Sequence, residues 1–399
     1  MTTYTYLALL PRDGLFCKDG RGWYTSASGR GHGLDWPWPS TILGALRTAW
    51  GRTVEAVSGK LLDHTTWPTQ TAAVQLGRML TLRRPPDTDW NTTHLVWTAP
   101  LDALWLEGRR EVFPLQPIPS RAPTLGRDDD TARESLWRPA LDEAGKPLPS
   151  PRWWPQEDFV AWLTGQRVSA QKPFPATARR VQTRVGIRPE TLTTDDGLLF
   201  SHDVIETLEL RAEWAIGVEV TLPDGSLNAV ETATLGSDSR LVRIETLPET
   251  LFAPPARLLE TFQAGSRGLR IIAVTPLAFA RGWLPDGFEP RDGEYIGRLP
   301  GIAHDLVLRA AFVPRPLHVS GWDRAAHGGK GTPKPTARMV APGAVYFFER
   351  TDGQPFDASH ARSLWLAALG ARTEEGFGRV VPGIWHPLPE TPNTTKPTP

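Results

Sequence analysis

The chain has 399 residues, and its 44 lysines and arginines balance 44 aspartates and glutamates. This length predicts two domains rather than one core, and zero net charge means that any nucleic-acid site must be recognised from local charge. The single cysteine, Cys17, excludes an internal disulfide and a cysteine-based zinc cluster.

Residues 1–262 predict the order strand, helix, strand, strand, helix, strand. Residues 4–10 mix tyrosine and threonine with an apolar run and predict the first strand. Ser40 can cap the helix that follows, whose apolar residues recur at three- and four-residue spacing. This stripe consists of Leu43, Leu46, Trp50, Val54 and Val57.

Residues 68–155 are broken by many prolines, and we interpret them as a lineage-variable insertion with some short strands. Beyond them, residues 180–187 and 198–200 predict a hairpin with a polar tip. The remaining elements of this half are strands within 205–222, a short helix at 227–235 that Gly236 stops, and a strand at 241–247.

The pattern repeats more loosely in the second half. Asp357 caps a predicted helix with a stripe of alanines, Leu364 and Trp365, and Gly370 ends this helix. The first helix expected in this half is poorly formed or lost between residues 276 and 300. Strands are predicted at residues 269–275, 306–313, 344–348 and 379–385.

This order predicts an α+β fold of two tandem ferredoxin-like, or RRM-like, domains. The N-terminal domain spans residues 1–262, with the insertion at about 68–155 and a protruding β-hairpin at about 179–200. The C-terminal domain spans residues 263–390 and carries a glycine-rich loop, and residues 391–399 form a disordered tail.

The apolar run at the N-terminus is too short for a signal peptide. No stretch approaches the roughly 20 apolar residues of a membrane span. We therefore expect a cytoplasmic protein without membrane contact.

Basic residues gather in two stretches. Residues 167–189 contain six bases and no acid, and residues 315–338 contain five bases against Asp323. Segregated charge of this kind can present a basic groove to phosphates, although solvated loops are the alternative. The second stretch forms a long glycine- and lysine-bearing loop, which we expect to contact RNA or a partner.

Lys18, Arg21 and Arg30 flank Trp23 and its tyrosine neighbour. This interleaving suits single-stranded RNA, because cations follow phosphates while rings stack on bases. Core packing of Trp23 is the alternative. Arg30 and His32 also lie in a polar glycine-rich loop that could wrap an RNA backbone.

Gly376, Gly378 and Arg379 lie between a predicted helix and a predicted strand. A dinucleotide-binding loop lies between a strand and a helix, so that function is excluded. The glycines could let backbone amides approach a phosphate, with Arg379 supplying charge. The alternative is a turn that needs positive φ.

Catalysis finds little support in the sequence. No histidine pair has metal-ligand spacing, and we predict neither a metal nor a cofactor. His32, His202 and His327 are the histidines in loops that could act as a base in metal-independent RNA cleavage. Lone loop histidines are usually structural or inert.

Four blocks occur in the order found in RAMP proteins. They read Asp13-Gly14-Leu15-Phe16 through Gly20-Arg21, Pro37 through Arg47, Arg184-Val185-Gly186-Ile187 through Gly197-Leu198-Leu199-Phe200, and Gly376 through Gly383. The chain therefore resembles the RAMP superfamily of CRISPR-associated proteins. In particular, it resembles the type III-B (Cmr) effector subunit that binds the 5′ handle of the crRNA.

The resemblance implies a non-catalytic subunit for antiviral defence. Its implied partners are the crRNA, the large polymerase-like subunit and the backbone RAMP subunits, with target RNA contacted only indirectly. By position, Lys18, Arg21 and Arg47 would face handle phosphates. The whole predicted RNA-binding set is Lys18, Arg21, Trp23, Arg30, His32, Arg47, Arg179, Arg180, Arg184, Lys330, Lys334, Arg338, Gly376, Gly378 and Arg379.

Three alternatives remain open. The chain could be the equivalent subunit of a type III-A or type I complex, or a metal-independent endoribonuclease that processes crRNA. It could also be a docking protein that touches only neighbouring subunits, for which zero net charge is expected.

Overall fold

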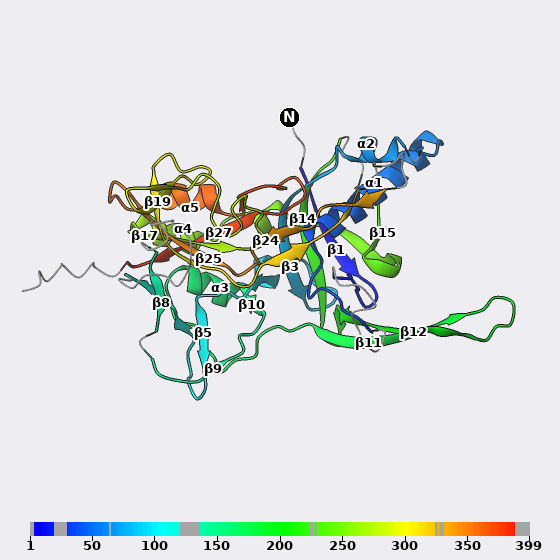
Figure 1. Cartoon of the computed structure of the whole chain (residues 1–399), viewed down its shortest axis with the longest axis horizontal. Helices are drawn as coiled ribbons and strands as arrows, with labels where there is room; N and C mark the ends of the chain where they lie inside the picture. Colours follow the sequence, from blue (N-terminus) through cyan, green and yellow to red (C-terminus); the bar gives the residue numbers. More distant parts are fainter. Residues whose placement is uncertain are drawn as a thin grey trace, which may run out of the picture.

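The structure, a computed structural model, describes residues 4–19, 30–63, 65–119, 136–141, 143–223, 227, 230–323, 326 and 331–387. It has a mixed α+β architecture in which two large antiparallel sheets lie beside each other along the long axis, and a hairpin projects from one end (Figure 1). None of the helices in these residues is long and apolar enough to cross a membrane.

The first sheet is built from strands that lie between residues 4 and 246 of the chain. In spatial order it consists of β10 (Trp153–Pro155), β4 (Leu95–Thr98), β3 (Gln75–Arg84), β14 (Ala212–Thr221), β1 (Tyr4–Pro11), β16 (Arg240–Thr246) and β15 (Thr232–Leu235), with β13 (Leu208–Glu209) beside β14. Strand β14 is buried along almost its whole length, as expected for a strand covered on both faces.

The second sheet is built from the C-terminal third of the chain. In spatial order it consists of β18 (Glu289–Arg291), β19 (Glu294–Gly297), β20 (Leu306–Phe312), β25 (Val345–Arg350), β17 (Gly268–Ala273), β27 (Arg379–Trp385) and β26 (Ala367–Ala368). Its central strand β17 is buried at every position.

Five helices and several short strand pairs complete the described fold. The helices are α1 (Pro39–Ser58), α2 (Trp67–Thr71), α3 (Gln156–Leu163), α4 (Ala256–Gln263) and α5 (Ala358–Leu364). The short sheets are β11 (Ala178–Ile187), β12 (Thr194–Glu206) and β2 (Arg30–Gly31); β6 (Phe113–Pro114), β5 (Ala103–Leu106) and β9 (Pro147–Leu148); β7 (Gln116–Ile118) and β8 (Arg138–Ala140); β21 (Leu317–Val319) and β24 (Ala337–Met339); and β22 (Trp322–Asp323) and β23 (Thr332–Pro333).

Most strands with a strong local pattern are confirmed. The predicted strands at 4–10, 241–247, 269–275, 306–313, 344–348 and 379–385 match β1, β16, β17, β20, β25 and β27 to within two residues at each end. Asp357 caps α5 as predicted, because its carboxylate accepts from the amides of Ser359 and His360. Residues 276–300, all of them described, contain β18 and β19 and no helix, which confirms that loss.

Other predictions were wrong in their details. Helix α1 starts at Pro39 with Trp38 as its N-cap, so Ser40 lies inside the first turn and makes no cap. Its buried stripe ends early, since Val57 is 85% exposed. Helix α5 ends at Leu364 rather than at Gly370, because residues 367–368 pair with β27.

The two largest differences concern strands. Residues 232–235, predicted as helix, form β15, because their backbone pairs with the edge of β16. Residues 68–155, interpreted as an insertion, contain β3 and β4, which lie inside the first sheet. Part of that segment is therefore integral to the fold.

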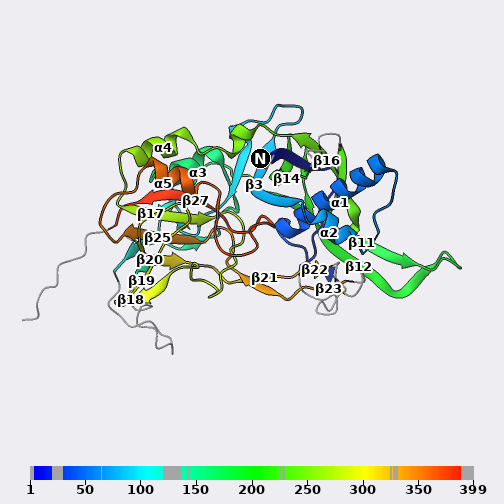
Figure 2. The same ribbon diagram turned by 90° about the horizontal axis from the view of Figure 1, so that it is seen from above.

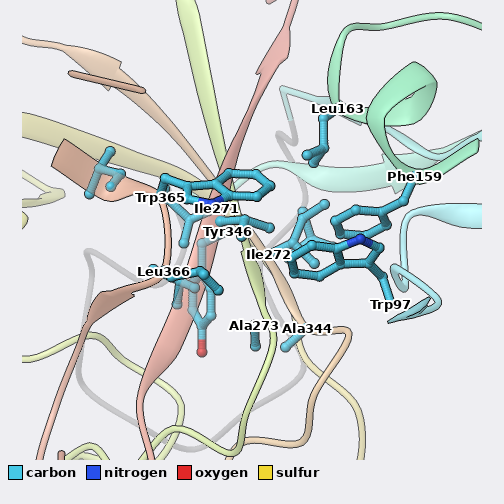
Figure 3. Packing of buried hydrophobic residues seen from close by; sticks show 14 of the residues in the cluster. Trp97, Phe159, Leu163, Ile271, Ile272, Ala273, Ala344, Tyr346, Trp365 and Leu366 are labelled. Atoms are coloured by element: carbon cyan, nitrogen blue, oxygen red, sulfur yellow. The ribbon is translucent and has the colours of Figure 1, made fainter. Parts of the chain in front are cut away.

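The largest apolar cluster contains buried residues of both sheets, and a second cluster lies on the other face of the first sheet. Trp97 of β4 stacks on Phe159 of α3 with ring centroids 4.9 Å apart, and Trp97 meets Trp365 edge-on at 5.5 Å. Figure 3 shows these rings beside Ile272 of β17. Aromatic contacts of this geometry add to the free energy gained from area burial, so the middle of the chain joins the two sheets.

A buried ion pair lies in the same junction. Arg270 of β17 donates through Nη1 to Oδ2 of Asp102 at 2.6 Å, and both side chains are almost completely buried. The indole of Trp162 donates to the other Asp102 oxygen at 2.9 Å, and its backbone carbonyl accepts from Arg270. The pair thus fixes the segment before β5 and the end of α3 against the second sheet.

Asp102→Ala should lower the free energy of unfolding by about 3–5 kcal/mol, because it leaves the Arg270 guanidinium buried without its counter-ion. Chemical denaturation monitored by circular dichroism measures this. Glu111→Ala, which breaks the exposed pair with Arg167, is the matched control and should leave the midpoint nearly unchanged. Equal midpoints for the two variants would contradict the assigned role of the junction.

Candidate nucleic-acid interface

The hairpin β11–β12 projects away from the first sheet (Figure 1). Its strands pair from Ala178 opposite Glu206 to Ile187 opposite Thr194, which confirms the predicted hairpin and lengthens it. Side chains alternate between its two faces. One face exposes Val181, Val185 and Leu199, and the other directs Arg180 and Arg184 towards the first sheet.

Arginines and carboxylates meet in pairs at the hairpin base. Arg180 Nε donates to Glu206 Oε1 at 2.5 Å, and Arg184 Nη2 lies 3.1 Å from Asp238 Oδ2. Arg240 donates to Asp13. Burial raises the pKa of Asp13, but the Gly14 amide and the Arg240 guanidinium outweigh it, so this pKa lies below its ordinary value. Asp13 is thus an ionised partner of Arg240.

His202 lies inside this base and is 2% exposed. Its ring centroid is 4.5 Å from that of Phe16, and neither ring nitrogen has a hydrogen-bond partner among the described residues. Burial lowers its pKa, although Asp238 opposes the shift. The structure therefore places this candidate base where RNA cannot reach it. His32 is more accessible, with Nδ1 3.9 Å from Asp203, and His327 lies outside the described residues.

Two cavities lie beside the segment that precedes α1. The larger, of about 720 Å³, is bounded by residues 33–39, by β3 and β4, and by residues 316–320 of the second half. The smaller, of about 580 Å³, is lined by Lys172, Phe174 and Arg179 among others. Both cavities share Asp35, Arg152 and Trp153.

Asp35 connects the two cavities to the hairpin. Its Oδ1 accepts from Arg179 Nη2 at 2.5 Å, and its Oδ2 accepts from Arg152 Nη1 at 2.7 Å. Sequence analysis missed Asp35 and Arg152. Arg152 lies in the proline-broken stretch that was interpreted as an insertion. It is more than 100 residues from Asp35 in the sequence, so no local signal could have found the pair.

The predicted residues before α1 are only partly described. Lys18 forms a bridge with Gly33 on the segment that bounds the larger cavity. The backbone of Arg30 pairs in parallel with Ser201 of the hairpin. The predictions for Arg21, Trp23 and Lys330 fall outside the described residues.

A second group of predicted residues gathers around Glu375, at the junction of the two sheets. Arg47 donates to the carbonyls of Val74 and Ala72. Burial lowers its pKa, while Glu375 and Glu374 oppose the shift. Lys334 Nζ lies 3.7 Å from Glu375 Oε1.

Arg338 lies farther along the same excursion of the chain. It pairs with His318 across the ribbon β21–β24, and both residues are exposed. Figure 2 shows this ribbon reaching from the second sheet towards the first.

The glycine-rich loop uses its amides within the chain. The Gly376 amide donates to the Thr373 carbonyl, the Gly378 amide to the Pro276 carbonyl, and the Arg379 amide to Thr275 Oγ1. Arg379 also donates to the Thr373 carbonyl. Each of these three amides therefore has an acceptor within the chain, and a phosphate contact through them stays a prediction.

Comparison with known proteins identifies the family. A model described as CRISPR-associated protein (Cas_Cmr3) matches residues 7–385. The chain belongs to this family. The match confirms the resemblance to a type III-B Cmr subunit drawn from the four sequence blocks. No curated protein matches the sequence.

Two solved structures are similar to this Cas_Cmr3 family member. A chain of the type III-B Cmr-beta bound to cognate target RNA, determined by cryo-EM, has 11% identity and a TM-score of 0.42 over 87% of this chain and 86% of that chain. A chain of Cmr-beta bound to cognate target RNA and AMPPnP, state 1, has 11% identity and a TM-score of 0.41 over 86% of each chain.

Close packing explains the two loop glycines of this Cas_Cmr3 protein. A Cβ on Gly376 would lie 2.7 Å from a methyl carbon of Leu76 in β3, and one on Gly378 would lie 2.3 Å from the Leu369 carbonyl oxygen. Both glycines have positive φ, 89° and 83°. The loop therefore joins β27 to β3, and the predicted alternative of a positive-φ turn is confirmed.

Gly378→Ala should lower the free energy of unfolding by about 3 kcal/mol or more. The Leu369 carbonyl oxygen would have to move away from the new Cβ, and alanine would be strained at the positive φ of this position. Gly353→Ala is the matched control, because Gly353 has φ 68° and open space around it, so only about 1–2 kcal/mol of backbone strain is expected. Thermal unfolding measures both. A Gly378→Ala protein of unchanged stability that loses RNA affinity would instead support a phosphate contact.

Proposed function

We propose that the protein is a non-catalytic RNA-binding subunit of a type III-B CRISPR effector complex, and that it holds the 5′ handle of the crRNA. The observation that carries this proposal is the family match over residues 7–385. The large polymerase-like subunit and the backbone RAMP subunits are its proposed protein partners. This assignment is favoured over a type III-A or type I subunit because the matching family is the Cmr one.

The topology supports the fold part of the proposal. The four central strands of the first sheet have the order β16-β1-β14-β3, and those of the second have the order β27-β17-β25-β20. Numbered along the chain within each half, both orders read fourth, first, third, second. We interpret each as a ferredoxin-like sheet. The first half has a helix, α1, after its first strand, and the second half has one, α5, before its last.

The hairpin base supports RNA binding even though its arginines are paired. The side chains of Arg180 and Arg184 are 50% and 38% exposed. Exposed ion pairs contribute about 0–1 kcal/mol, whereas a guanidinium can bind a phosphate through two parallel hydrogen bonds. A phosphate can therefore replace the carboxylate at small cost.

Arg184→Gln should weaken crRNA binding to a similar extent for different handle sequences, because the arginine would contact phosphate rather than a base edge. The slope of log K against log salt should flatten by about one unit. Fluorescence anisotropy with labelled crRNA over a salt series measures this. Arg211→Gln, at an exposed arginine on the turn between β13 and β14, is the control. Loss of affinity for only one handle sequence would argue for base readout instead.

Repeat-containing precursor RNA incubated with the purified protein in EDTA should remain intact, because the proposed subunit holds crRNA without cutting it. His202 is buried, and His32 faces Asp203 at 3.9 Å. Gel electrophoresis of end-labelled RNA measures cleavage. Site-specific cutting that His32→Ala abolishes would favour the processing endoribonuclease, and Asp203→Asn tests whether that pair matters.

A further inference from the structure

Two arginines from distant segments converge on one exposed carboxylate at the boundary of the two cavities. Arg152 immediately precedes β10, Arg179 lies in β11, and Asp35 lies in the segment before α1. Each carboxylate oxygen accepts from one guanidinium, at 2.7 and 2.5 Å. The Asp35 side chain is 62% exposed, whereas those of Arg152 and Arg179 are 42% and 33% exposed. The acid is thus the outermost member of the group.

Contacts other than Asp35 hold both guanidinium groups in place. Arg179 Nη2 also donates to the Leu34 carbonyl at 3.0 Å. The Arg152 guanidinium carbon lies 5.1 Å from the ring centroid of Trp153, which is itself buried. If the Asp35 side chain turned away, the guanidinium groups of Arg152 and Arg179 would remain near their positions. The two cavities beside them would leave space for another acceptor.

Electrostatics leave this group short of negative charge. Two guanidinium groups share one carboxylate, and the positive charge of Arg179 disfavours the positive charge of Arg152. Burial lowers the pKa of Arg152, Asp35 raises it, and Arg179 lowers it again. A phosphate carries more acceptor oxygens than a carboxylate and accepts parallel hydrogen bonds from arginine, so it would satisfy the pair better than Asp35 does.

We propose that Arg152 and Arg179 form a backbone-phosphate site for single-stranded RNA, and that Asp35 occupies this site as an internal competitor until RNA displaces it. The inference rests on the proposed RNA-binding function and adds a specific site to it. Displacement costs little, because the released carboxylate is already largely hydrated. Asp35 would then limit affinity for RNA that cannot bring a phosphate between the two cavities.

The test measures the affinity of the full-length chain for fluorescein-labelled crRNA. Asp35→Asn keeps the shape of the side chain, removes its charge, and should tighten binding about two- to five-fold, the range expected for losing an exposed competing ion pair. Asp89→Asn makes the same charge change at an exposed carboxylate that has no ion pair among the described residues, and it should have a smaller effect. Arg152→Gln and Arg179→Gln should each weaken binding and flatten the salt slope by about one unit.

The decisive comparison is a thermodynamic cycle in which one arm is Asp35→Asn and the other is the double substitution Arg152→Gln with Arg179→Gln. The gain from Asp35→Asn should disappear when Arg152 and Arg179 are both glutamine, because the competitor then has nothing to release. A gain that persists in that background would show general charge repulsion and overturn the site. Unchanged affinity in Asp35→Asn, with a lower melting temperature, would identify Asp35 as a structural clasp and also overturn it.

The outcomes for the wild-type chain separate the two proposals. If the unaltered protein does not bind crRNA, the proposed function itself fails. If it binds and Asp35→Asn has no effect, only the Asp35 site fails. Inorganic phosphate at constant ionic strength is the second probe: stabilisation of Asp35→Asn by phosphate, without any change in RNA affinity, would assign the site to a free anion rather than to RNA.

Discussion

The buried contact between Asp102 and Arg270 is the constraint on which the arrangement of the two sheets depends. A buried charge pair gains little net free energy, because desolvation offsets the attraction, but it admits few alternative packings. Here the carboxylate comes from the middle of the chain and the guanidinium from β17. The same middle segment contributes β4 and β10 to the first sheet. Both of these strands extend the first sheet, whereas Asp102, which lies between them in the chain, is fixed to the second sheet, and Arg152, just before β10, is positioned as a result.

Charge pairing also bears on the proposal that a protein of zero net charge binds RNA. At the hairpin base Arg180, Arg184 and Arg179 each face a carboxylate, so in this part of the described surface these arginines do not form a row of unpaired cations. Under the proposed function, binding to RNA would be an exchange of acceptors rather than simple attraction. Such an exchange keeps net charge at zero and disfavours polyanions that do not fit.

The sequence predicted the elements whose signals are local and missed those that depend on distant partners. The strand β1, the hairpin and the strand β27 have period-two or β-branched patterns of their own. Strand β3 carries Arg78 and Arg84, which look like exposed residues. They are paired with Glu219 and Glu213, more than 120 residues away, and only the folded sheet brings these partners together. Asp35 and Arg152 escaped notice for the same reason, whereas Arg179 was found through its basic neighbourhood.

The helices that cover the second sheet show why the two halves of the chain are not independent. The second half has no helix after its first strand, and α3 and α4, which precede that strand in the chain, pack with α5 against β27 instead. Figure 2 shows these three helices together over the second sheet. Helix α3 ends at Leu163, within the half assigned to the N-terminal domain, and α4 ends beside the predicted boundary at residue 262. A cut at that boundary would remove α3 and most of α4 from the sheet that they cover and expose Phe262 and Leu258, both fully buried. The C-terminal half therefore lacks part of its own core, and we expect the whole chain to unfold as one cooperative unit.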